Sequence, residues 1–240
     1  MTAAVESSLR RLQTDVIDLY QLHWPNRGSY HFRKWYKFDP TEQDTARVQD
    51  DILATLETAK AMQAAGKIRE LGLSNESTWG TAQFLDMAAK NDLPRVVSVQ
   101  NEYSLLCRHF DTDFAELSHH EEVGLLAFSP LAAGILSGKY LGGETPAGSR
   151  KSINSVLGGR LTDRVEAPVR AYAEIAKKHG LDLVQMALAF CASRPFMTSL
   201  IFGATTMEQL STALGASDLT LSQDVLDDIQ AVYIAHPIPM

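Results

Sequence analysis

Short apolar runs and longer stretches with helical spacing take turns along the chain. Residues 2–12 predict an amphipathic helix, because Val5, Leu9 and Leu12 recur on one of its sides. The run DVIDLYQLH, residues 15–23, is apolar with little alternation, which is typical of a strand covered on both faces. A polar, aromatic-rich segment over residues 26–50 predicts a long loop, and loops of this length are usually functional or mobile.

The same order of strand and helix continues to the end of the chain. A helix is expected over residues 50–66, with Asp50 or Asp51 as its N-cap and Gly66 as its stop. Further strands are predicted at 68–75, 95–106, 123–130 and 199–205. Further helices are predicted at 78–92, 114–120, 165–179, 182–193, 206–216 and 222–236, the last capped by Ser222. Because a helix separates each strand from the next, the pattern predicts a parallel α/β sheet with right-handed crossovers, in one domain over residues 1–240.

Two architectures fit this order, a doubly wound open sheet and a (β/α)8 barrel. The first strand ends in HWPNRG, without the glycine fingerprint that a dinucleotide-binding open sheet needs there. GILSGKY is one residue short of a P-loop and carries Tyr140 where a magnesium-binding Ser or Thr belongs. A barrel instead places polar residues at the carboxyl ends of many strands. Such residues are found here at His23, Ser74–Asn75, Gln100–Asn101, Ser129 and Thr205–Thr206. The sequence therefore favours a barrel with about five of its eight strands present.

Composition and charge narrow the class of protein further. The chain is 45% apolar and 21% charged, as folded proteins are, and its net charge of −7 gives no overall attraction to nucleic acid or anionic membrane. Cys107 and Cys191 form no CxxC pair, which favours a reducing cytosol. The first residues carry charges where a signal peptide needs an apolar core, and no apolar run reaches the roughly 18 residues of a membrane span. We expect a cytoplasmic protein without nucleic-acid or membrane partners.

Five segments in a fixed order carry a resemblance to a known family. LRRLQTDVIDLYQLHWP, AGKIRELGLSNES, VQNEYSLL, FSPLAAGILSGKY and IFGATTMEQL resemble the aldo-keto reductase superfamily, and within it the Tas-like subgroup of NADP(H)-dependent reductases. The resemblance covers essentially all 240 residues and implies a (β/α)8 TIM barrel of the aldo-keto reductase type. It also implies that the chain begins in the helix before the fourth barrel strand, so that the barrel is N-terminally incomplete.

The resemblance implies that His23 is a catalytic residue. In the family, an aspartate, a tyrosine and a lysine from the first three βα units act together with a histidine, and only the histidine has a match here, in QLHWP. The imidazole orients and polarises the carbonyl oxygen of the substrate, the tyrosine donates the proton and the nicotinamide gives the hydride. Without the family match, a strand-end histidine bonded to a neighbouring carbonyl is the simpler interpretation.

The resemblance also implies a binding site for NADP(H), with NAD(H) less favoured. Ser74, Asn75 and Gln100 match the side chains that hold the nicotinamide carboxamide, although Ser and Asn are also common at plain strand-end turns. Phe128 matches an aromatic stacked on the nicotinamide and is otherwise a core residue. Matches to the phosphate and adenosine contacts, which are otherwise flexible-loop, surface or N-cap residues, are Ser129, Leu131, Gly134, Lys139, Arg150, Gly203, Thr205 and Gln209.

Three residues depart from the family pattern at the adenosine end of this site. Thr212 and Ala213 stand where the family usually has Glu and Asn on the adenine, and Met207 stands where many members have Arg or Lys. These departures keep NAD(H) open as the alternative cofactor.

Two other clusters have a second interpretation. SHHEE, residues 118–122, has the residue types of a metal site, but it lies at a polar helix end with no third partner, so we expect no metal. The resemblance implies that the aromatic, basic loop WPNRGSYHFRKWYKF, residues 24–38, shapes the substrate pocket. The alternative, a nucleic-acid surface, is disfavoured because this is one loop in an acidic protein.

The leading hypothesis is an oxidoreductase that transfers a hydride from NADP(H) to an aldehyde or ketone. Because the family's Asp, Tyr and Lys have no match, we expect these 240 residues alone to be several orders of magnitude less active than a complete homologue. The alternative is a non-catalytic NADP(H)-binding or protein-interaction module with the same fold, like the potassium-channel β-subunits. Unpaired strand edges also predict self-association.

Overall fold

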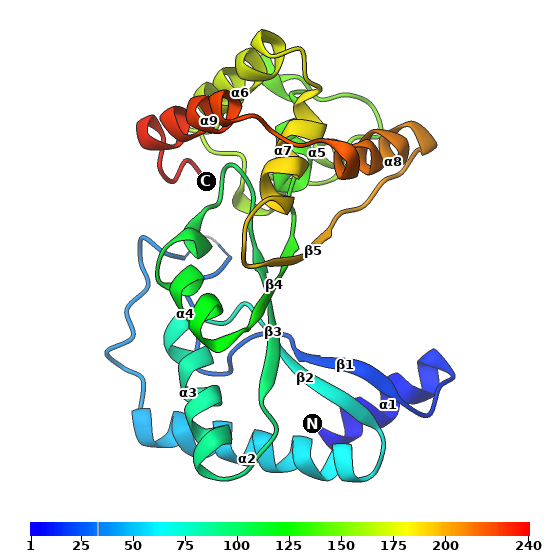
Figure 1. Ribbon diagram of the computed structural model, residues 1–240, viewed down its shortest axis with the longest axis vertical. Coiled ribbons are helices and arrows are strands. Elements are labelled where there is room, and N and C mark those ends of the chain that lie inside the picture. The colour runs from blue at the N-terminus through cyan, green and yellow to red at the C-terminus, as the bar shows by residue number, and fades with distance from the viewer. Residues whose placement is uncertain (33) are drawn as a thin grey trace. The chain divides into compact units, whose positions relative to one another are not determined.

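Strands and helices alternate along most of the chain (Figure 1). The computed structural model describes residues 1–32 and 34–240; Arg33, in the aromatic loop, lies outside the described residues. The strands are β1 (Ile17–Leu22), β2 (Ile68–Ser74), β3 (Val96–Glu102), β4 (Gly124–Phe128) and β5 (Met197–Ile201). The helices are α1 (Thr2–Leu12), α2 (Thr45–Ala64), α3 (Thr78–Lys90), α4 (Asp113–Glu121), α5 (Arg150–Ile153), α6 (Glu166–Lys178), α7 (Leu183–Ala192), α8 (Met207–Leu214) and α9 (Gln223–Ala235).

The strands follow one another in sequence order across a single sheet, β1-β2-β3-β4-β5. β1 pairs with β2 in parallel, with Ile17 opposite Ile68 and Leu22 opposite Leu73, and β2 pairs with β3 in parallel. The parallel α/β class predicted from the sequence is confirmed. Within the described residues the sheet does not close, which is consistent with an incomplete (β/α)8 barrel of the aldo-keto reductase type. Self-association through the end strands stays a prediction.

The chain divides into two compact units. The first comprises residues 1–101 and 113–125, and the second comprises residues 102–112 and 126–240. The prediction of a single domain is not tested by this division and stays a prediction. No helix in the described part of the chain combines the length and the apolar character that crossing a membrane requires.

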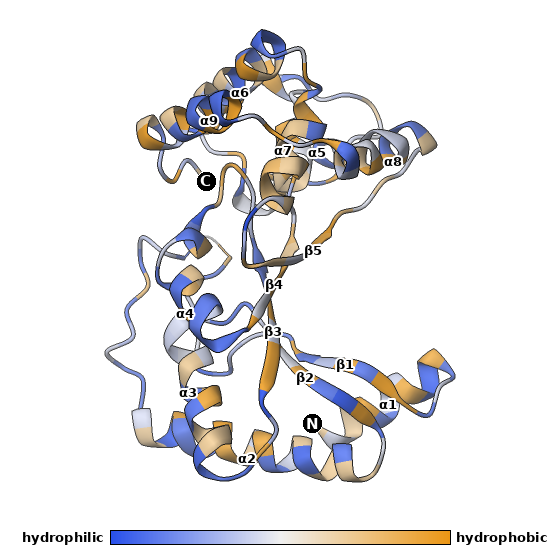
Figure 2. Ribbon diagram, viewed as in Figure 1, coloured by the Kyte–Doolittle hydropathy of each residue, from blue (hydrophilic) through white to orange (hydrophobic). Residues whose placement is uncertain are grey.

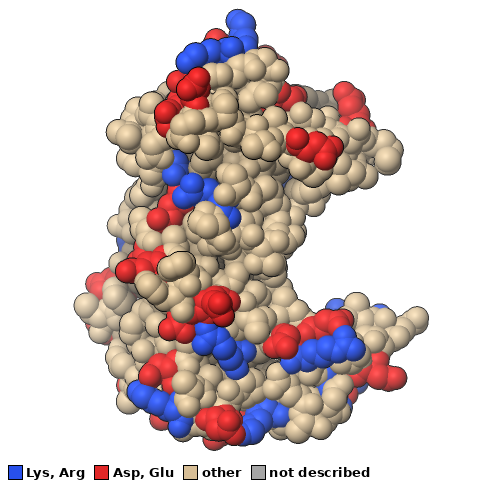
Figure 3. Space-filling view, in the orientation of Figure 1, with Lys and Arg blue, Asp and Glu red and all other residues tan. Residues whose placement is uncertain are grey.

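In the first unit, α2 packs against both α3 and β2. Apolar side chains explain this contact, since Leu56 on α2, Leu71 and Leu73 on β2 and Phe84 on α3 are all buried. Burying a side chain of this kind contributes about 1.5–3 kcal/mol. Figure 3 shows acidic and basic side chains interspersed on the visible surface, and exposed pairs such as Lys90–Asp86 (2.7 Å) each contribute little.

Three of the predicted element boundaries were wrong by four residues or more, and one of them is the end of β3, at Glu102 rather than residue 106. α2 begins at Thr45 rather than near residue 50, because the Asp44 carboxylate accepts a hydrogen bond from the Arg47 amide at 3.2 Å and caps the helix. Asp51, expected as a cap, instead accepts a hydrogen bond from Asn26 at 3.0 Å. β5 ends at Ile201, four residues before the predicted end, because the next residue packs its side chain against α7 and α8. The short helix α5 was not predicted.

In the second unit, α7 is apolar over most of its length (Figure 2) and packs against α6, α8 and β5. A buried polar cluster lies in the same unit: the Tyr103 hydroxyl donates to Asp111 at 2.6 Å, and Arg108 donates to the other carboxylate oxygen at 2.5 Å. Burial raises the pKa of the Tyr103 hydroxyl, so it stays protonated and keeps donating. Burial likewise raises the pKa of the Cys191 thiol, which is therefore unreactive.

Candidate active site

His23 follows directly after the last residue of β1. Its imidazole is exposed and stacks on Trp24, with ring centroids 4.2 Å apart and planes 27° apart. Its ring nitrogens make no hydrogen bond to the residues that the structure describes. The simpler interpretation of a histidine bonded to a neighbouring carbonyl is therefore not what the structure contains, and both nitrogens are available to a ligand.

Ser74, Asn75 and Gln100 form one hydrogen-bonded group with His23 at the carboxyl ends of β1, β2 and β3. The Ser74 hydroxyl donates to the Gln100 carbonyl oxygen at 2.8 Å, and the Asn75 amide N–H donates to the same oxygen at 3.0 Å. The side-chain Nδ2 of Asn75 donates to the His23 carbonyl oxygen at 2.9 Å and to Ser74 Oγ at 3.1 Å. The structure thus brings together the four predicted site residues of the first unit.

The conformation of Asn75 directs its side chain into this group. Its φ is 53°, in the left-handed region that Asn tolerates better than most residues. Asn75 is 3% exposed, yet its Oδ1 has no hydrogen-bond partner among the described residues. Leaving a buried acceptor unsatisfied costs about 1–3 kcal/mol. A buried, unused acceptor beside a strand end is the kind of group that a ligand donor satisfies.

Gln100 supplies the complementary donor. Its Oε1 accepts a hydrogen bond from Gln21 Nε2 at 3.1 Å, and its own Nε2 makes no bond to the described residues. A free donor on Gln100 and a free acceptor on Asn75 together match the acceptor and the donor of a carboxamide ligand. Sequence reasoning missed Gln21. Its signal was a polar residue on an apolar strand, two positions before His23 and therefore on the same face.

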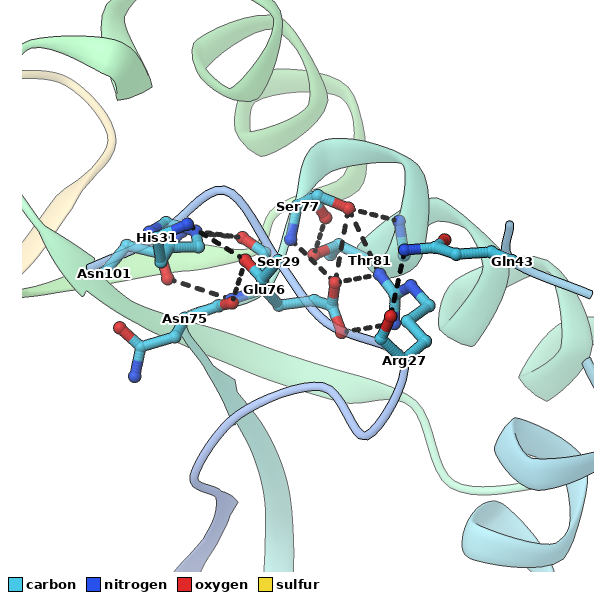
Figure 4. Close-up of polar contacts among 10 residues, drawn as sticks. Arg27, Ser29, His31, Gln43, Asn75, Glu76, Ser77, Thr81 and Asn101 are labelled. Carbon is cyan, nitrogen blue, oxygen red and sulfur yellow. Dashed lines mark hydrogen bonds and ion pairs between the residues drawn. The ribbon is translucent and has the colours of Figure 1, made fainter. Parts of the chain in front are cut away.

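The turn after Asn75 is held by the loop that follows His23 (Figure 4). The Ser29 hydroxyl donates to the Asn75 carbonyl oxygen at 3.2 Å, and His31 Nε2 donates to the Glu76 carbonyl oxygen at 3.1 Å. The Glu76 carboxylate forms a buried ion pair with Arg27. Sequence reasoning missed this network as well.

In the second unit, the predicted nicotinamide and pyrophosphate residues lie at and after the end of β4. Phe128 is half-buried, and Ser129 follows with a φ of 53°. Leu131 packs against a core cluster of α7 and the end of α8, which anchors the segment. The Gly134 N–H donates to the Leu131 carbonyl oxygen at 2.9 Å, so this N–H is already engaged. The expected phosphate contacts of this segment stay predictions.

Lys139 and Arg150 are exposed and form no ion pair within the described part of the chain. The Lys139 ammonium lies 5.3 Å from the centroid of the Tyr140 ring, and its side chain rests against Gly134, where an added Cβ would lie 3.2 Å from Nζ. Arg150 is the first residue of α5. The phosphate contacts predicted for both residues stay predictions.

The start of α8 is capped by its own side chains. Gln209 Oε1 accepts hydrogen bonds from the Thr205 N–H at 3.0 Å and its hydroxyl at 3.1 Å, while the Gln209 N–H donates to Thr206 Oγ1 at 3.2 Å. Thr205 and Gln209 are therefore brought together, but their polar groups bond to one another. Gly203 is exposed, and an added Cβ there would meet open space.

The departures from the family pattern have different surroundings. Met207, the first residue of α8, is 76% exposed, whereas Ala213 is buried in the α7–α8 core.

His119 and His120 lie near the end of α4 with their ring centroids 5.0 Å apart. The described residues contain no group of three or more side chains that could hold a metal ion.

The chain is similar to known proteins over nearly its whole length. The model of the aldo/keto reductase family matches residues 1–234. "Protein tas" of Escherichia coli (strain K12) is 45% identical over 240 residues, which cover 98% of this chain and 67% of that protein. An aldo-keto reductase of Babesia bovis is 37% identical over 223 residues, 86% of this chain and 76% of its own. A probable voltage-gated potassium channel subunit beta of Arabidopsis thaliana is 30% identical over 241 residues, 97% and 66% of the two chains.

Proposed function

Because the chain belongs to the aldo/keto reductase family, we propose that it is an oxidoreductase that uses NADP(H) to reduce the carbonyl group of an aldehyde or ketone. The observation that carries the proposal is the buried, unpartnered Oδ1 of Asn75, hydrogen-bonded through its Nδ2 to the backbone of His23. An acceptor for the nicotinamide carboxamide and a histidine for the substrate thus belong to one network.

Each residue of the network has a separate task in this proposal. Asn75 Oδ1 accepts from the carboxamide NH2 of the cofactor and Gln100 Nε2 donates to its oxygen, which fixes the face of the ring that meets the substrate. When bound, the reduced nicotinamide supplies the hydride. The exposed imidazole of His23 donates a hydrogen bond to the carbonyl oxygen of the substrate, where negative charge develops during the reaction.

The second unit supplies the charges for the phosphates in this proposal. Lys139 and Arg150 are unpaired cations, and Thr205 at the start of α8 becomes a donor when the Gln209 side chain moves aside. Met207 offers no charge to a 2′-phosphate, so NAD(H) is the alternative cofactor.

The alternative function is an NADP(H)-binding module without turnover. It is favoured by the similarity to the potassium channel subunit beta. The two functions share the binding site and differ only in the fate of the hydride.

A titration with NADPH, followed by the change in its own fluorescence, tests the binding site. Asn75→Gly keeps the left-handed backbone and removes the side-chain amide, so we expect the dissociation constant to rise about tenfold or more, the loss of one or two hydrogen bonds. An unchanged dissociation constant in this variant would refute the assignment of Asn75.

Oxidation of the bound NADPH by 4-nitrobenzaldehyde then separates the two functions. Turnover that follows NADPH binding, even when it is several orders of magnitude slower than that of a complete homologue, supports the oxidoreductase, and binding without any detectable turnover supports the module. A wild-type chain that binds neither NADPH nor NADH would refute both.

A further inference from the structure

Arg27 and Glu76 form a buried ion pair between two loops of the first unit (Figure 4). Their side chains are 7% and 4% exposed. Arg27 Nη1 donates to Glu76 Oε2 at 3.1 Å and Nη2 donates to Oε1, so the contact is bidentate. Nη2 also donates to the Ser77 hydroxyl at 3.2 Å, and the guanidinium carbon lies 5.2 Å from the centroid of the Trp79 ring.

Glu76 follows Asn75 directly in the chain, so the ion pair lies next to the residue whose side-chain amide belongs to the proposed site. The Glu76 N–H donates to Asn101 Oδ1 at 3.2 Å and the Glu76 carbonyl oxygen accepts from Asn101 Nδ2 at 2.9 Å, which fixes the turn from β3. From the other side, Ser29 and His31 bond to the carbonyl oxygens of Asn75 and Glu76. The Asn75 side chain points away from the ion pair (Figure 4), and its Nδ2 donates to the His23 carbonyl oxygen and to Ser74 Oγ.

Apolar packing does not by itself hold this loop. Trp24 and Arg27 line a cavity of about 180 Å³ together with Leu73 and Phe84, so space is left beneath the loop. Trp24 itself is 58% exposed. Polar contacts to the turn after β2 therefore define where the loop lies.

Compared with apolar side chains in the same place, the ion pair lowers the stability of the protein in two ways. A buried ion pair is weak support for stability, because apolar residues of similar volume are often as good or better. In addition, α3 has a glycine at its third residue, where Ala would favour the helix. A Cβ on Gly80 would lie 2.2 Å from both Arg27 Nη2 and Glu76 Oε1. The glycine leaves the space that the ion pair occupies.

We propose that Arg27 and Glu76 are positioning residues for the nicotinamide end of the cofactor. Their bidentate contact joins the loop after His23 to the turn after Asn75. It thereby fixes the position of the Asn75 side-chain amide relative to the His23 imidazole. This inference rests on the proposed function, because it assigns a role to the same site. The planar fork of arginine, more than its charge, carries the role.

The test compares two ligands that differ only in the nicotinamide: NADPH, and 2′-phospho-ADP-ribose, which lacks it. Arg27→Lys keeps the charge and loses the fork, and Arg27→Met with Glu76→Leu replaces the pair by apolar side chains so that no unpaired charge is buried. For both variants we expect the dissociation constant of NADPH to rise about tenfold, which is about 1.4 kcal/mol, and that of 2′-phospho-ADP-ribose to change less than twofold.

Arg69→Gln is the matched control, because it removes an arginine from an exposed ion pair with Asp18 in the same unit. It is expected to change neither dissociation constant. An equal loss of affinity for both ligands in the Arg27 variants would show a merely structural role and overturn the inference, as would NADPH affinity that matches the wild type. Failure of the wild-type chain to bind NADPH would instead overturn the proposed function, and the inference with it.

Discussion

Gly80→Ala tests the ion pair directly, because the added Cβ has two opposing effects on stability: it favours the helix and it clashes with the ion pair. Alanine in a helix is favoured over glycine by up to about 1 kcal/mol, so helix propensity alone predicts that the substitution raises the free energy of unfolding. The new Cβ, however, would lie 2.2 Å from Arg27 Nη2, 2.2 Å from Glu76 Oε1 and 2.6 Å from Glu76 Cδ. Since real Cβ atoms do not approach so closely, the ion pair must open.

The cost of opening exceeds the gain in helix propensity. Removing one partner of a buried ion pair costs about 3–5 kcal/mol, because the remaining charge is buried without compensation, and this figure is the upper bound for pushing the two partners apart. The free energy of unfolding should therefore fall, by up to about 4 kcal/mol. In a protein of this size, 1 kcal/mol corresponds to roughly 2–4 °C in the melting temperature, so the expected fall is up to roughly 15 °C.

Urea unfolding of the wild type, Gly80→Ala and the control Gly203→Ala measures this difference. Gly203 has a backbone conformation open to all residues and no atom within 4 Å of an added Cβ, so its substitution should be neutral or slightly stabilising. A double-mutant cycle adds Gly80→Ala to the chain with Arg27→Ala and Glu76→Ala. There the clash is gone, and the substitution should stabilise by up to about 1 kcal/mol. Gly80→Ala at or above wild-type stability in the intact chain would refute the reasoning.

Three further substitutions test other parts of the molecule. Met207→Arg places a cation at the exposed start of α8 and should raise the ratio of the NADH to the NADPH dissociation constant about three- to tenfold, with Met207→Gln as the neutral control. Tyr103→Phe should lower the free energy of unfolding by about 1.5–3 kcal/mol in urea, more than Tyr172→Phe, because Tyr103 donates to a carboxylate and Tyr172 to a neutral carbonyl oxygen at 3.2 Å. Hydrogen bonds from His179 and Lys178 hold the pKa of Asp228 below its ordinary value, so the stabilisation is present above the unfolded pKa and is lost as the pH falls through the lower folded pKa. The difference in melting temperature between the wild type and Asp228→Asn should therefore shrink between pH 6 and pH 2.5, and a difference that does not vary with pH would contradict this assignment.

Contacts between neighbours in sequence were the most predictable from the sequence. The apolar run before His23 and the Ser222 cap of α9, which accepts from the Val225 N–H, follow from local rules. The start of α2 was missed because both Asp44 and Asp50 are good caps, and the choice depends on burial of Val48 in the core, which extends the helix backward. A local pattern cannot report that burial.

Only those site residues that lie at strand ends could be predicted from the sequence. Ser74, Asn75 and Gln100 come from ends of parallel strands that meet at one edge of the sheet, and the structure bonds them together. The Arg27–Glu76 pair joins residues 49 positions apart in two different loops. No spacing along one sequence specifies such a pair, because it depends on how the two loops are placed by the sheet.

Several departures from the usual rules of stability lie together at the turn after β2. Asn75 has a left-handed backbone and a buried acceptor without a partner, Arg27 and Glu76 are charged and buried, and α3 has a glycine in its first turn. Each costs free energy on its own, by about 1–3 kcal/mol for a strained backbone or an unsatisfied acceptor. Costs of this kind persist where they serve a function, and sequences that fold well avoid them elsewhere. Exposed pairs such as Arg170–Glu166 carry no such cost. At the turn that holds the Asn75 amide, this unit therefore gives up stability for a defined geometry, and a ligand that satisfies Asn75 Oδ1 would recover part of it.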